Sequence, residues 1–475
     1  MLIGVGFHAR RIYIPTLQKL SANHNIELVA CVDIAEQKEV VDGYLEKNGL
    51  MSKIDMVYVK SRESLGAEDK RQLNEMVKKH HIEGVIISTE PLAHKMYAQW
   101  ALENRLSILM DKPITTRKAL ATSEKAAAGL YEDYQDLLTQ YKQLQKKKKT
   151  VFIINTQRRY DAGFKKVLEL IKEARDAFNI PVTSIQAFYA DGTWVHPNEI
   201  LEQRSHPYLH GYGKCSHSGY HIFDIVWQFY LAGALPKKQA DSLEVFSSFI
   251  NPSGYSTQIS YQDYKAYFGK EFVQPKLAFD QYREMVKNYG EIDASSVVKC
   301  LRNGDGVCNI SINMMHNSFS RRAWGKPNSD LYKGNGRVKH QQFIIQQGPF
   351  QSVHIHNYQS NDAHDVDNSD QFAVGGNNHF DIYVFRNAQM FGTETPMQII
   401  SNKDLQEKAS SRLTIEQTKD LVLLEFIEFL EGRVKKEAIV SNIDSHKVPV
   451  QIMSAVYQSN ARHGKGKNPV IKMPL

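Results

Sequence analysis

The sequence has few cysteines, no long apolar run and only a modest charge. Four cysteines are scattered over 475 residues, which favours reduced thiols in a cytoplasmic protein over a disulfide framework. No apolar stretch approaches the ~18 residues needed to span a bilayer. Met1 leads directly into a glycine turn, so we expect no signal peptide. The formal charge of +7 comes without a clustered basic and aromatic surface, so we expect neither nucleic acid nor membrane as a partner.

The pattern of elements changes part-way along the chain. In the first part, short apolar runs alternate with helical patterns, as a parallel sheet requires. We expect strands there at 26–32, 56–59, 85–87, 106–110 and 150–154, and helices at 67–80, 91–104 and 117–145. After Pro181 strands and turns dominate, and we expect strands at 182–190, 297–301, 307–314, 341–346, 353–358 and 381–386. Further helices are expected at 164–174, 218–231, 421–430 and 448–459.

A chain of this length exceeds the single-domain range, and the change of pattern suggests where it divides. We predict an α/β protein with a doubly wound parallel sheet in residues 1–157. Residues 158–475 are predicted to form an α+β domain with a large, mainly antiparallel sheet that binds substrate and mediates oligomerisation.

A glycine turn stands at the start of the chain. Gly4-Val5-Gly6-Phe7-His8-Ala9 has the Gly-x-Gly-x-x-Ala spacing of a dinucleotide-binding turn, whose glycines let the backbone approach a pyrophosphate at a helix start. Asp33 ends the next predicted strand. An aspartate there can accept both ribose hydroxyls and repels a 2′-phosphate, which favours NAD over NADP. The structural alternative for Asp33 is a helix N-cap.

A lysine emerges at the edge of the predicted parallel sheet. The strand at 85–87 ends at Ser88-Thr89-Glu90-Pro91, and the strand at 106–110 ends at Asp111-Lys112-Pro113. Ligands bind at the carboxyl ends of strands in open α/β sheets, and the fixed φ of Pro113 stiffens the turn that presents the lysine. By itself Lys112 could be an ordinary surface lysine. Together with the glycine turn and Asp33, in this order, it indicates a cofactor site.

A second group of chemically active residues lies near the predicted helix at 218–231. If this helix starts a turn early, His217 and His221 lie at i, i+4 on one face, with Asp224 three positions further. A neutral imidazole can take a proton from a hydroxyl, and a neighbouring acid can fix its tautomer. Two alternatives stay open: a divalent metal site, and a purely structural cluster. The full group is His206, His210, Cys215, His217, His221 and Asp224.

In this order, the motifs resemble the glucose–fructose oxidoreductase / inositol dehydrogenase superfamily, called Gfo/Idh/MocA. Further matching residues are His94, Gln157-Arg158-Arg159-Tyr160 and Gly219-Tyr220-His221-Ile222-Phe223-Asp224. The resemblance implies an N-terminal Rossmann domain with the cofactor-binding residues Gly4, Gly6, Phe7, His8, Ala9, Asp33, Ser88, Thr89, Pro91, His94, Asp111 and Lys112. It implies the catalytic residues Lys112, His221, Asp224 and His217, and the substrate-binding residues Arg158, Tyr160, His217 and His221. No metal is expected.

Two residues depart from the family pattern. Asp111 stands where the family usually has glutamate, and His217 stands where inositol dehydrogenase-like members have an aspartate four positions before the histidine. By the resemblance, Lys112 contacts the substrate hydroxyl and the nicotinamide ribose, and His221 is the acid/base. Asp224 is then a possible orienting partner for His221.

Three functions are compatible with this pattern. The first is an NAD-dependent oxidoreductase acting on a sugar, cyclitol or related polyol, assembled as a dimer or tetramer like many relatives. The second is a non-catalytic, cofactor-sensing regulator on the same scaffold. The third is an enzyme that uses bound NAD transiently to cleave a glycosidic bond or eliminate a group.

Overall fold

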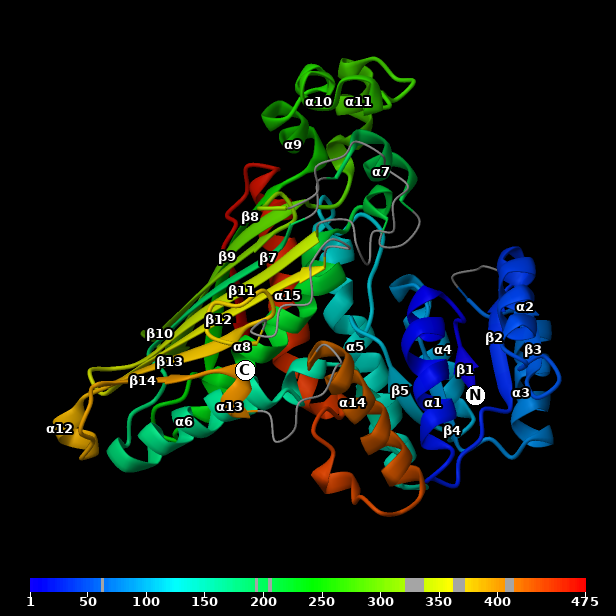
Figure 1. Cartoon of the computed structure of the whole chain (residues 1–475), viewed down its shortest axis with the longest axis horizontal. Coiled ribbons are helices and arrows are strands. Elements are labelled where there is room, and N and C mark those ends of the chain that lie inside the picture. Colours follow the sequence, from blue (N-terminus) through cyan, green and yellow to red (C-terminus); the bar gives the residue numbers. More distant parts are fainter. Residues whose placement is uncertain (61–63, 193–194, 204–206, 321–336, 362–371, 406–413) are drawn as a thin grey trace. The chain divides into compact units, whose positions relative to one another are not determined.

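A computed structural model describes the chain except residues 61–63, 193–194, 204–206, 321–336, 362–371 and 406–413 (Figure 1). The chain folds into two compact units, and each is built from segments that are separate in sequence. Unit 1 contains Met1–Thr116, Leu130–Asp161 and Arg412–Lys447. Unit 2 contains Arg117–Gly129, Ala162–Ser411 and Val448–Leu475.

Unit 1 is built on a six-stranded, wholly parallel sheet with the order β3-β2-β1-β4-β5-β6. This is the strand order of a Rossmann fold, in which the switch point lies between β1 and β4. The strands are β1 (Leu2–Ile3), β2 (Ala30–Ile34), β3 (Asp55–Val59), β4 (Gly84–Ile87), β5 (Ser107–Met110) and β6 (Phe152–Ile154). The main helices are α1 (Ile14–Leu20), α2 (Lys38–Lys47), α3 (Ala67–Lys79), α4 (His94–Glu103), α5 (Glu124–Gln145) and α14 (Thr414–Leu430). The first residues of α5, up to Gly129, belong to unit 2.

Side chains from both ends of the sequence fill the core on one face of this sheet. Leu2, Ile86 and Leu109 from the strands pack in one buried cluster with Tyr13 and with Phe426 of α14. Helix α14 therefore belongs to unit 1, although it begins 260 positions after the end of β6 (414 − 154). A helix near the C-terminal end of the sequence thus covers part of the first sheet.

Two predicted elements of this region begin later than expected. The strand predicted at 26–32 starts at Ala30, because its neighbour β1 begins only at Leu2, which pairs with Cys31. The residues before Ala30 have no partner strand on that side. The helix predicted at 117–145 starts at Glu124, after a turn in which Ala119 has a positive φ of 59°.

Unit 2 is built on a nine-stranded sheet with the order β14-β13-β12-β11-β7-β10-β9-β8-β15. Every neighbouring pair is antiparallel except β7 and β10. The strands are β7 (Ser184–Gly192), β8 (Ser242–Ile250), β9 (Asp293–Arg302), β10 (Asp305–Met315), β11 (Arg337–Gln347), β12 (Gln351–Asn361), β13 (Phe380–Arg386), β14 (Met397–Ile400) and β15 (Ile471–Pro474). The two sheets confirm the predicted fold class.

Helices α6 (Ala162–Phe178), α8 (Tyr220–Ala232) and α15 (Lys447–His463) lie along one face of this sheet (Figure 1). Between β8 and β9 the chain inserts three short helices, α9 (Pro252–Gln258), α10 (Tyr261–Phe268) and α11 (Phe279–Met285). Three shorter helices complete the unit, namely α7 (Pro197–Glu202), α12 (Ala388–Phe391) and α13 (Asn402–Leu405). Among the helices that the structure describes, none has both the length and the apolar character to cross a bilayer.

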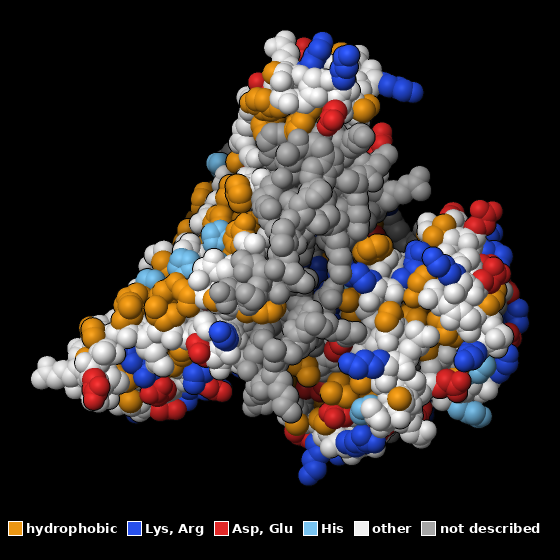
Figure 2. All heavy atoms as spheres, viewed as in Figure 1, with side chains coloured by type: hydrophobic (Ala, Val, Ile, Leu, Met, Phe, Trp, Pro, Cys, Tyr) orange, Lys and Arg blue, Asp and Glu red, His pale blue; other side chains and the backbone are white. Residues whose placement is uncertain are grey.

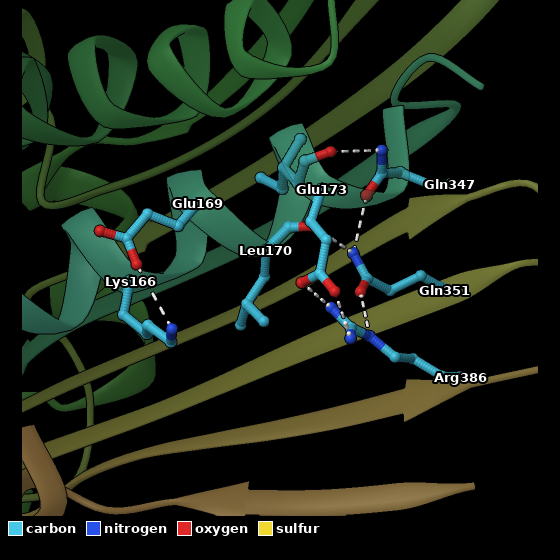
Figure 3. A network of polar contacts seen from close by, with 8 residues as sticks. Lys166, Glu169, Leu170, Glu173, Gln347, Gln351 and Arg386 are labelled. Carbon is cyan, nitrogen blue, oxygen red and sulfur yellow. Dashed lines mark hydrogen bonds and ion pairs between the residues drawn. The ribbon is translucent and has the colours of Figure 1, made fainter. Parts of the chain in front are cut away.

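Buried amides fix helix α6 to the sheet (Figure 3). The Gln351 amide donates to the Leu170 carbonyl at 3.0 Å and to Gln347 Oε1 at 2.8 Å. Arg386 donates to Gln351 Oε1 at 2.8 Å and forms a two-point ion pair with Glu173 at 3.0 and 2.6 Å. The ends of β11, β12 and β13 are thereby tied to the middle of α6.

Candidate active site

The glycine turn of unit 1 is shaped by one tight approach and one open position. Gly4 has a φ of +89°, and a Cβ placed on it would lie 2.4 Å from the Ser88 carbonyl oxygen. Only glycine fits there, because the turn packs against the end of β4. A Cβ built on Gly6, by contrast, has no atom within 4 Å among the described residues. The backbone at Gly6 is thus accessible to a ligand, as a pyrophosphate-binding turn requires.

Asp33 is folded back against this turn. Its Oδ2 accepts the Val5 backbone N–H at 2.7 Å, and its Oδ1 accepts the Ile34 N–H at 2.7 Å. Burial raises the pKa of the Asp33 carboxyl, and the two N–H groups oppose that rise. The short helical turn that follows has Ile34 at its N-cap, so Asp33 is not an N-cap residue there.

The residues after the glycines open the first helix. Phe7 is half exposed, and Ala9 begins a π-helical turn (Ala9–Tyr13) that leads into α1. The His8 ring packs edge-on against Tyr13, and its Nε2 lies 3.9 Å from Asp111 Oδ1. Burial lowers the pKa of His8 to about 4, in spite of the nearby carboxylate. The imidazole is therefore neutral at physiological pH.

Asp111 accepts hydrogen bonds from three side chains that are far apart in sequence. Its Oδ1 accepts from the Tyr13 hydroxyl at 2.6 Å and from Asn155 Nδ2 at 3.0 Å, and its Oδ2 accepts from the Ser88 hydroxyl at 2.7 Å. Burial raises the pKa of Asp111, but His8 and the Tyr13 and Ser88 hydroxyls outweigh it and hold the pKa below its usual value. No sequence pattern indicated Tyr13 or Asn155 as partners of Asp111. The predicted contact between Asp111 and the cofactor stays a prediction.

His94 contacts the backbone of the turn that contains Lys112. It is fully buried, and its Nδ1 lies 2.7 Å from the Pro113 carbonyl oxygen while its Nε2 lies 3.2 Å from that of Thr89. A neutral imidazole has one N–H to donate, and the shorter contact favours Nδ1 as the donor. Burial lowers the pKa of His94. Lys112 lies two residues after the end of β5, and its peptide bond to Pro113 is cis. Pro91 is buried at the start of the short helical turn before α4.

The two predicted substrate-binding residues of unit 1 are both buried. Tyr160 is 5% exposed, packs in the hydrophobic core and donates from its hydroxyl to Glu425 Oε2 of α14 at 2.5 Å. Arg158 is 6% exposed. The next residue, Arg159, donates to Ser445 Oγ at 2.7 Å. Substrate binding by Arg158 and Tyr160 stays a prediction.

In unit 2, the predicted acid/base residues lie where a π-helical turn runs into α8. The turn spans Cys215–Gly219 and contains His217, whereas His221 and Asp224 belong to α8. The α-helix begins at Tyr220, two residues later than the predicted 218, and the π-helical turn extends the helical segment back to Cys215. A π-turn winds more loosely than an α-turn, so His217 and His221 do not have the offset of an ideal i, i+4 pair. All three side chains are buried.

The other members of the histidine group occupy separate places. His206 lies outside the described residues. The His210 ring is 6.1 Å from that of Tyr212. Cys215 is a buried free thiol whose backbone N–H donates to Glu291 Oε1 at 2.7 Å, and burial raises its pKa. In the part of the chain that is described, no three His, Cys, Asp or Glu side chains are grouped for a metal ion.

A buried charged cluster beside His217 was missing from the sequence-based prediction. Lys214 is fully buried, with Nζ 3.6 Å from Asp191 Oδ2. Arg337 forms a two-point ion pair with the same carboxylate, one contact at 2.6 Å. Glu291 and Asp293 are buried nearby in the chain that follows the helical insertion. A lysine in a sequence is normally taken as a surface residue, so no local signal marked Lys214.

A protein-family model matches the first part of the chain. Residues 1–130 match the Gfo/Idh/MocA model, an oxidoreductase family with an NAD-binding Rossmann fold. The match confirms the resemblance predicted from the sequence. No curated protein sequence matches the chain.

Solved structures with the same fold share 12% of their residues with this chain. Levoglucosan dehydrogenase in complex with NADH and levoglucosan has a TM-score of 0.59, covering 100% of this chain and 98% of its own. An oxidoreductase from Agrobacterium radiobacter in complex with NAD+, L-tartaric acid and magnesium has a TM-score of 0.57, covering 100% and 97%. Aldose-aldose oxidoreductase from Caulobacter crescentus complexed with glycerol has a TM-score of 0.54, covering 100% and 98%. At this identity the likeness establishes the fold alone.

Proposed function

We propose that this chain, whose residues 1–130 match the NAD-binding domain of the Gfo/Idh/MocA oxidoreductases, is an NAD-dependent oxidoreductase. Its substrate in this proposal is a sugar, cyclitol or related polyol, oxidised at a carbon that bears a hydroxyl. The observation that carries the proposal is the glycine turn with the Asp33 carboxylate fixed 2.7 Å from the Val5 N–H. The solved structures of the same fold include an aldose-aldose oxidoreductase complexed with glycerol and a levoglucosan dehydrogenase complexed with levoglucosan.

The residues at the carboxyl edge of the parallel sheet fit a dinucleotide. Gly4 and Gly6 would let the backbone meet its pyrophosphate, at the start of the helix that begins with Phe7, His8 and Ala9. Asp33 would accept the ribose hydroxyls and disfavour a 2′-phosphate, so we propose NAD over NADP. Ser88, Thr89, Pro91, His94, Asp111 and Lys112 would complete the cofactor-binding edge. Bound NAD supplies the hydride acceptor.

The remaining chemistry is proposed for side chains of this protein. Lys112 would hold the substrate oxygen and stabilise negative charge that develops on it. His221 would take the hydroxyl proton, with Asp224 or His217 fixing its orientation. The buried setting of Asp224 and His217 favours such an orienting role.

Two single substitutions test this function. Lys112→Ala and His221→Ala should each lower NAD-linked turnover by roughly 10²–10⁴-fold, because each removes a group that acts on the reacting hydroxyl. Turnover would be followed by the absorbance of reduced cofactor with levoglucosan, D-glucose and myo-inositol as the polyol panel. Lys265→Ala, on the exposed side of α10, is the matched control.

NAD binding separates the possible outcomes. Both variants should bind NAD nearly as well as the wild-type protein in calorimetry, since the glycine turn and Asp33 are untouched. Wild-type turnover in both variants would contradict the proposed roles. Clear NAD binding without turnover of any panel compound would favour the regulator over the oxidoreductase.

We also propose that the protein is a homo-oligomer that pairs through the sheet face of unit 2 opposite its helices. Burial alternates along the strands, and the central positions that point away from the helices, named below, carry no charged side chain. Figure 2 shows hydrophobic and histidine side chains gathered where β9 to β13 lie in Figure 1. The central positions are Gln186, Phe188, His340, Gln342, Ile344, Gln346, Ser352, His354, His356, Tyr358, Tyr383 and Phe385.

A second copy of the chain suits this face best. An uncharged surface does not repel its own copy, and two antiparallel strands of 11 residues with their neighbours span roughly 800 Å², the area of a standard interface per partner. Light scattering should therefore give a dimer or tetramer, and Phe385→Glu should dissociate it. Met285→Glu, on exposed α11, is the control. A wild-type monomer at micromolar concentration would contradict the pairing.

A further inference from the structure

The segment that leads into the predicted acid/base helix begins with a buried ammonium group. Lys214 precedes the π-helical turn Cys215–Gly219, and its backbone N–H donates to the Glu291 carbonyl at 3.0 Å. Its side chain is fully buried, and Nζ lies 3.9 Å from the centre of the Tyr189 ring. The only carboxylate paired with Nζ among the described residues is Asp191, at 3.6 Å.

The Asp191 contact does not explain why the ammonium is there. Arg337 already pairs with both oxygens of that carboxylate, and the Tyr189 hydroxyl donates to Oδ2 at 3.3 Å. The Lys214 Nζ has no hydrogen-bond acceptor in the described part of the chain. A lysine ammonium has three donors, and burying a charge without hydrogen bonds is costly. The group therefore calls for a further acceptor.

Acceptors in the same situation lie close by. Asp293 uses Oδ1 to accept the backbone N–H groups of His316 and Asn317 at 2.9 and 3.0 Å, whereas its Oδ2 is buried and has no hydrogen bond within the described residues. Glu291 uses Oε1 to accept from the Tyr457 hydroxyl at 2.8 Å, and its Oε2 is in the same state as Asp293 Oδ2. Several such groups in one place are unusual, because buried polar atoms are nearly always hydrogen-bonded.

This cluster connects to His217 through described contacts. The His316 ring is hydrogen-bonded to the Tyr208 hydroxyl, and the Tyr208 ring packs against His217 with ring centres 5.7 Å apart. Lys214 itself is three positions before His217. Donor and acceptor groups thus lie next to the predicted acid/base residues of unit 2.

We propose that Lys214 is a specificity-determining residue, whose ammonium donates to a substrate hydroxyl while Asp293 and Glu291 offer the neighbouring acceptors. A polyhydroxy compound suits this set, because each hydroxyl both accepts and donates a hydrogen bond. The inference rests on the proposed polyol oxidoreductase function and adds a recognition group that the family motifs do not contain.

The protonation of the cluster supports this assignment. Burial lowers the pKa of Lys214 to about 7, and it raises the pKa of Glu291 to about 7 and that of Asp293 to about 6. Asp191, Arg337 and Asp293 are the charged groups that act on Lys214. Near neutrality the cluster therefore holds both donors and acceptors, as binding of several hydroxyls requires.

Ligand-induced thermal stabilisation of the full-length protein tests the inference without turnover. Ligand that binds only the native state raises the melting temperature. The wild-type protein should be stabilised by at least one compound of the polyol panel, and Lys214→Met should lose most of that shift. Lys214→Gln, which keeps N–H donors, should retain part of it, whereas Lys265→Met should behave as wild type. NAD binding by each variant shows that it is folded.

The outcomes separate this inference from the function on which it rests. A wild-type-sized shift in both Lys214 variants, or no shift by any panel compound in the wild-type protein, would overturn the role of Lys214. A shift that depends on Lys214, without NAD-linked turnover, would support recognition by Lys214 and count against the oxidoreductase. With turnover present, Lys214→Met should raise KM at least tenfold and change kcat less.

Discussion

The two units differ in how they satisfy a charged group, partly buried in unit 1 and fully buried in unit 2. In unit 1, the Asp111 carboxylate accepts from Tyr13, Ser88 and Asn155, so both of its oxygens are hydrogen-bonded. In unit 2, the Lys214 ammonium has one carboxylate at 3.6 Å and no hydrogen bond to the described residues. The first arrangement is complete without a ligand, and the second is not.

We infer from this difference that Asp111 positions the backbone, whereas Lys214 recognises a ligand. A fully bonded carboxylate such as Asp111 stabilises the end of β5 and thereby fixes the backbone from which Lys112 extends. A buried group that lacks hydrogen bonds costs stability, and that cost is recovered when a ligand supplies them. We therefore expect substitutions at Asp111 to act mainly on stability, and substitutions at Lys214 to act mainly on binding.

The largest effect is expected from Asp111→Ala. The substitution removes the acceptor of the Tyr13 and Ser88 hydroxyls, whereas the Asn155 amide keeps a second acceptor, the Tyr13 hydroxyl at 2.8 Å. Hydrogen bonds to a charged group are worth about 1.5–3 kcal/mol each. The free energy of unfolding should fall by about 3 kcal/mol or more, as measured by urea denaturation. Glu75→Ala, which removes an exposed ion pair with Arg71, should change it by less than about 1 kcal/mol. Equal effects would mean that the Asp111 network does not stabilise unit 1.

A smaller effect, dependent on pH, is expected from Lys214→Met. Burial lowers the pKa of Lys214 from 10.5 to about 7, so between these values the unfolded chain binds more protons than the native protein. Stability that depends on Lys214 should therefore rise with pH through that window. Between pH 7.5 and 9.5, the free energy of unfolding of the wild-type protein should rise by about 2 kcal/mol more than that of the variant. Urea denaturation at both pH values measures this difference. Parallel stability curves would show that Lys214 is solvated like a surface lysine.

The sequence was sufficient for features that are local. Asp33 and Lys112 each lie just after a predicted strand, and the glycine turn has a recognisable spacing of its own, so spacing and order were enough to predict that they share one edge of the sheet. The Asp111 network was not predictable in this way. Its partner Tyr13 is 98 positions away, and neither residue lies in a pattern that indicates the other.

The remaining differences have two causes: an element that packs against a distant part of the chain, and strands that are too short or too irregular to show a pattern. The sequence predicted a helix at 421–430, but only the fold shows that Val422 and Phe426 of α14 pack in the core of unit 1. The edge strands β14 and β15 have four residues each, too few for a reliable alternating pattern. Strand β8 was also missed, since its serines obscure the alternation of Leu243 and Val245.

The smallest effect comes from a matched pair of serines, one in each unit. The Ser88 hydroxyl donates to Asp111 Oδ2 at 2.7 Å, so Ser88→Ala should lower the free energy of unfolding by about 1–2 kcal/mol. The buried hydroxyl of Ser218 has no hydrogen-bond partner in the described parts of the chain. Ser218→Ala should therefore cost nothing or stabilise the protein slightly, since alanine also favours the helix. Urea denaturation of both variants measures the difference directly, and equal losses would remove the distinction between a completed and an incomplete polar site.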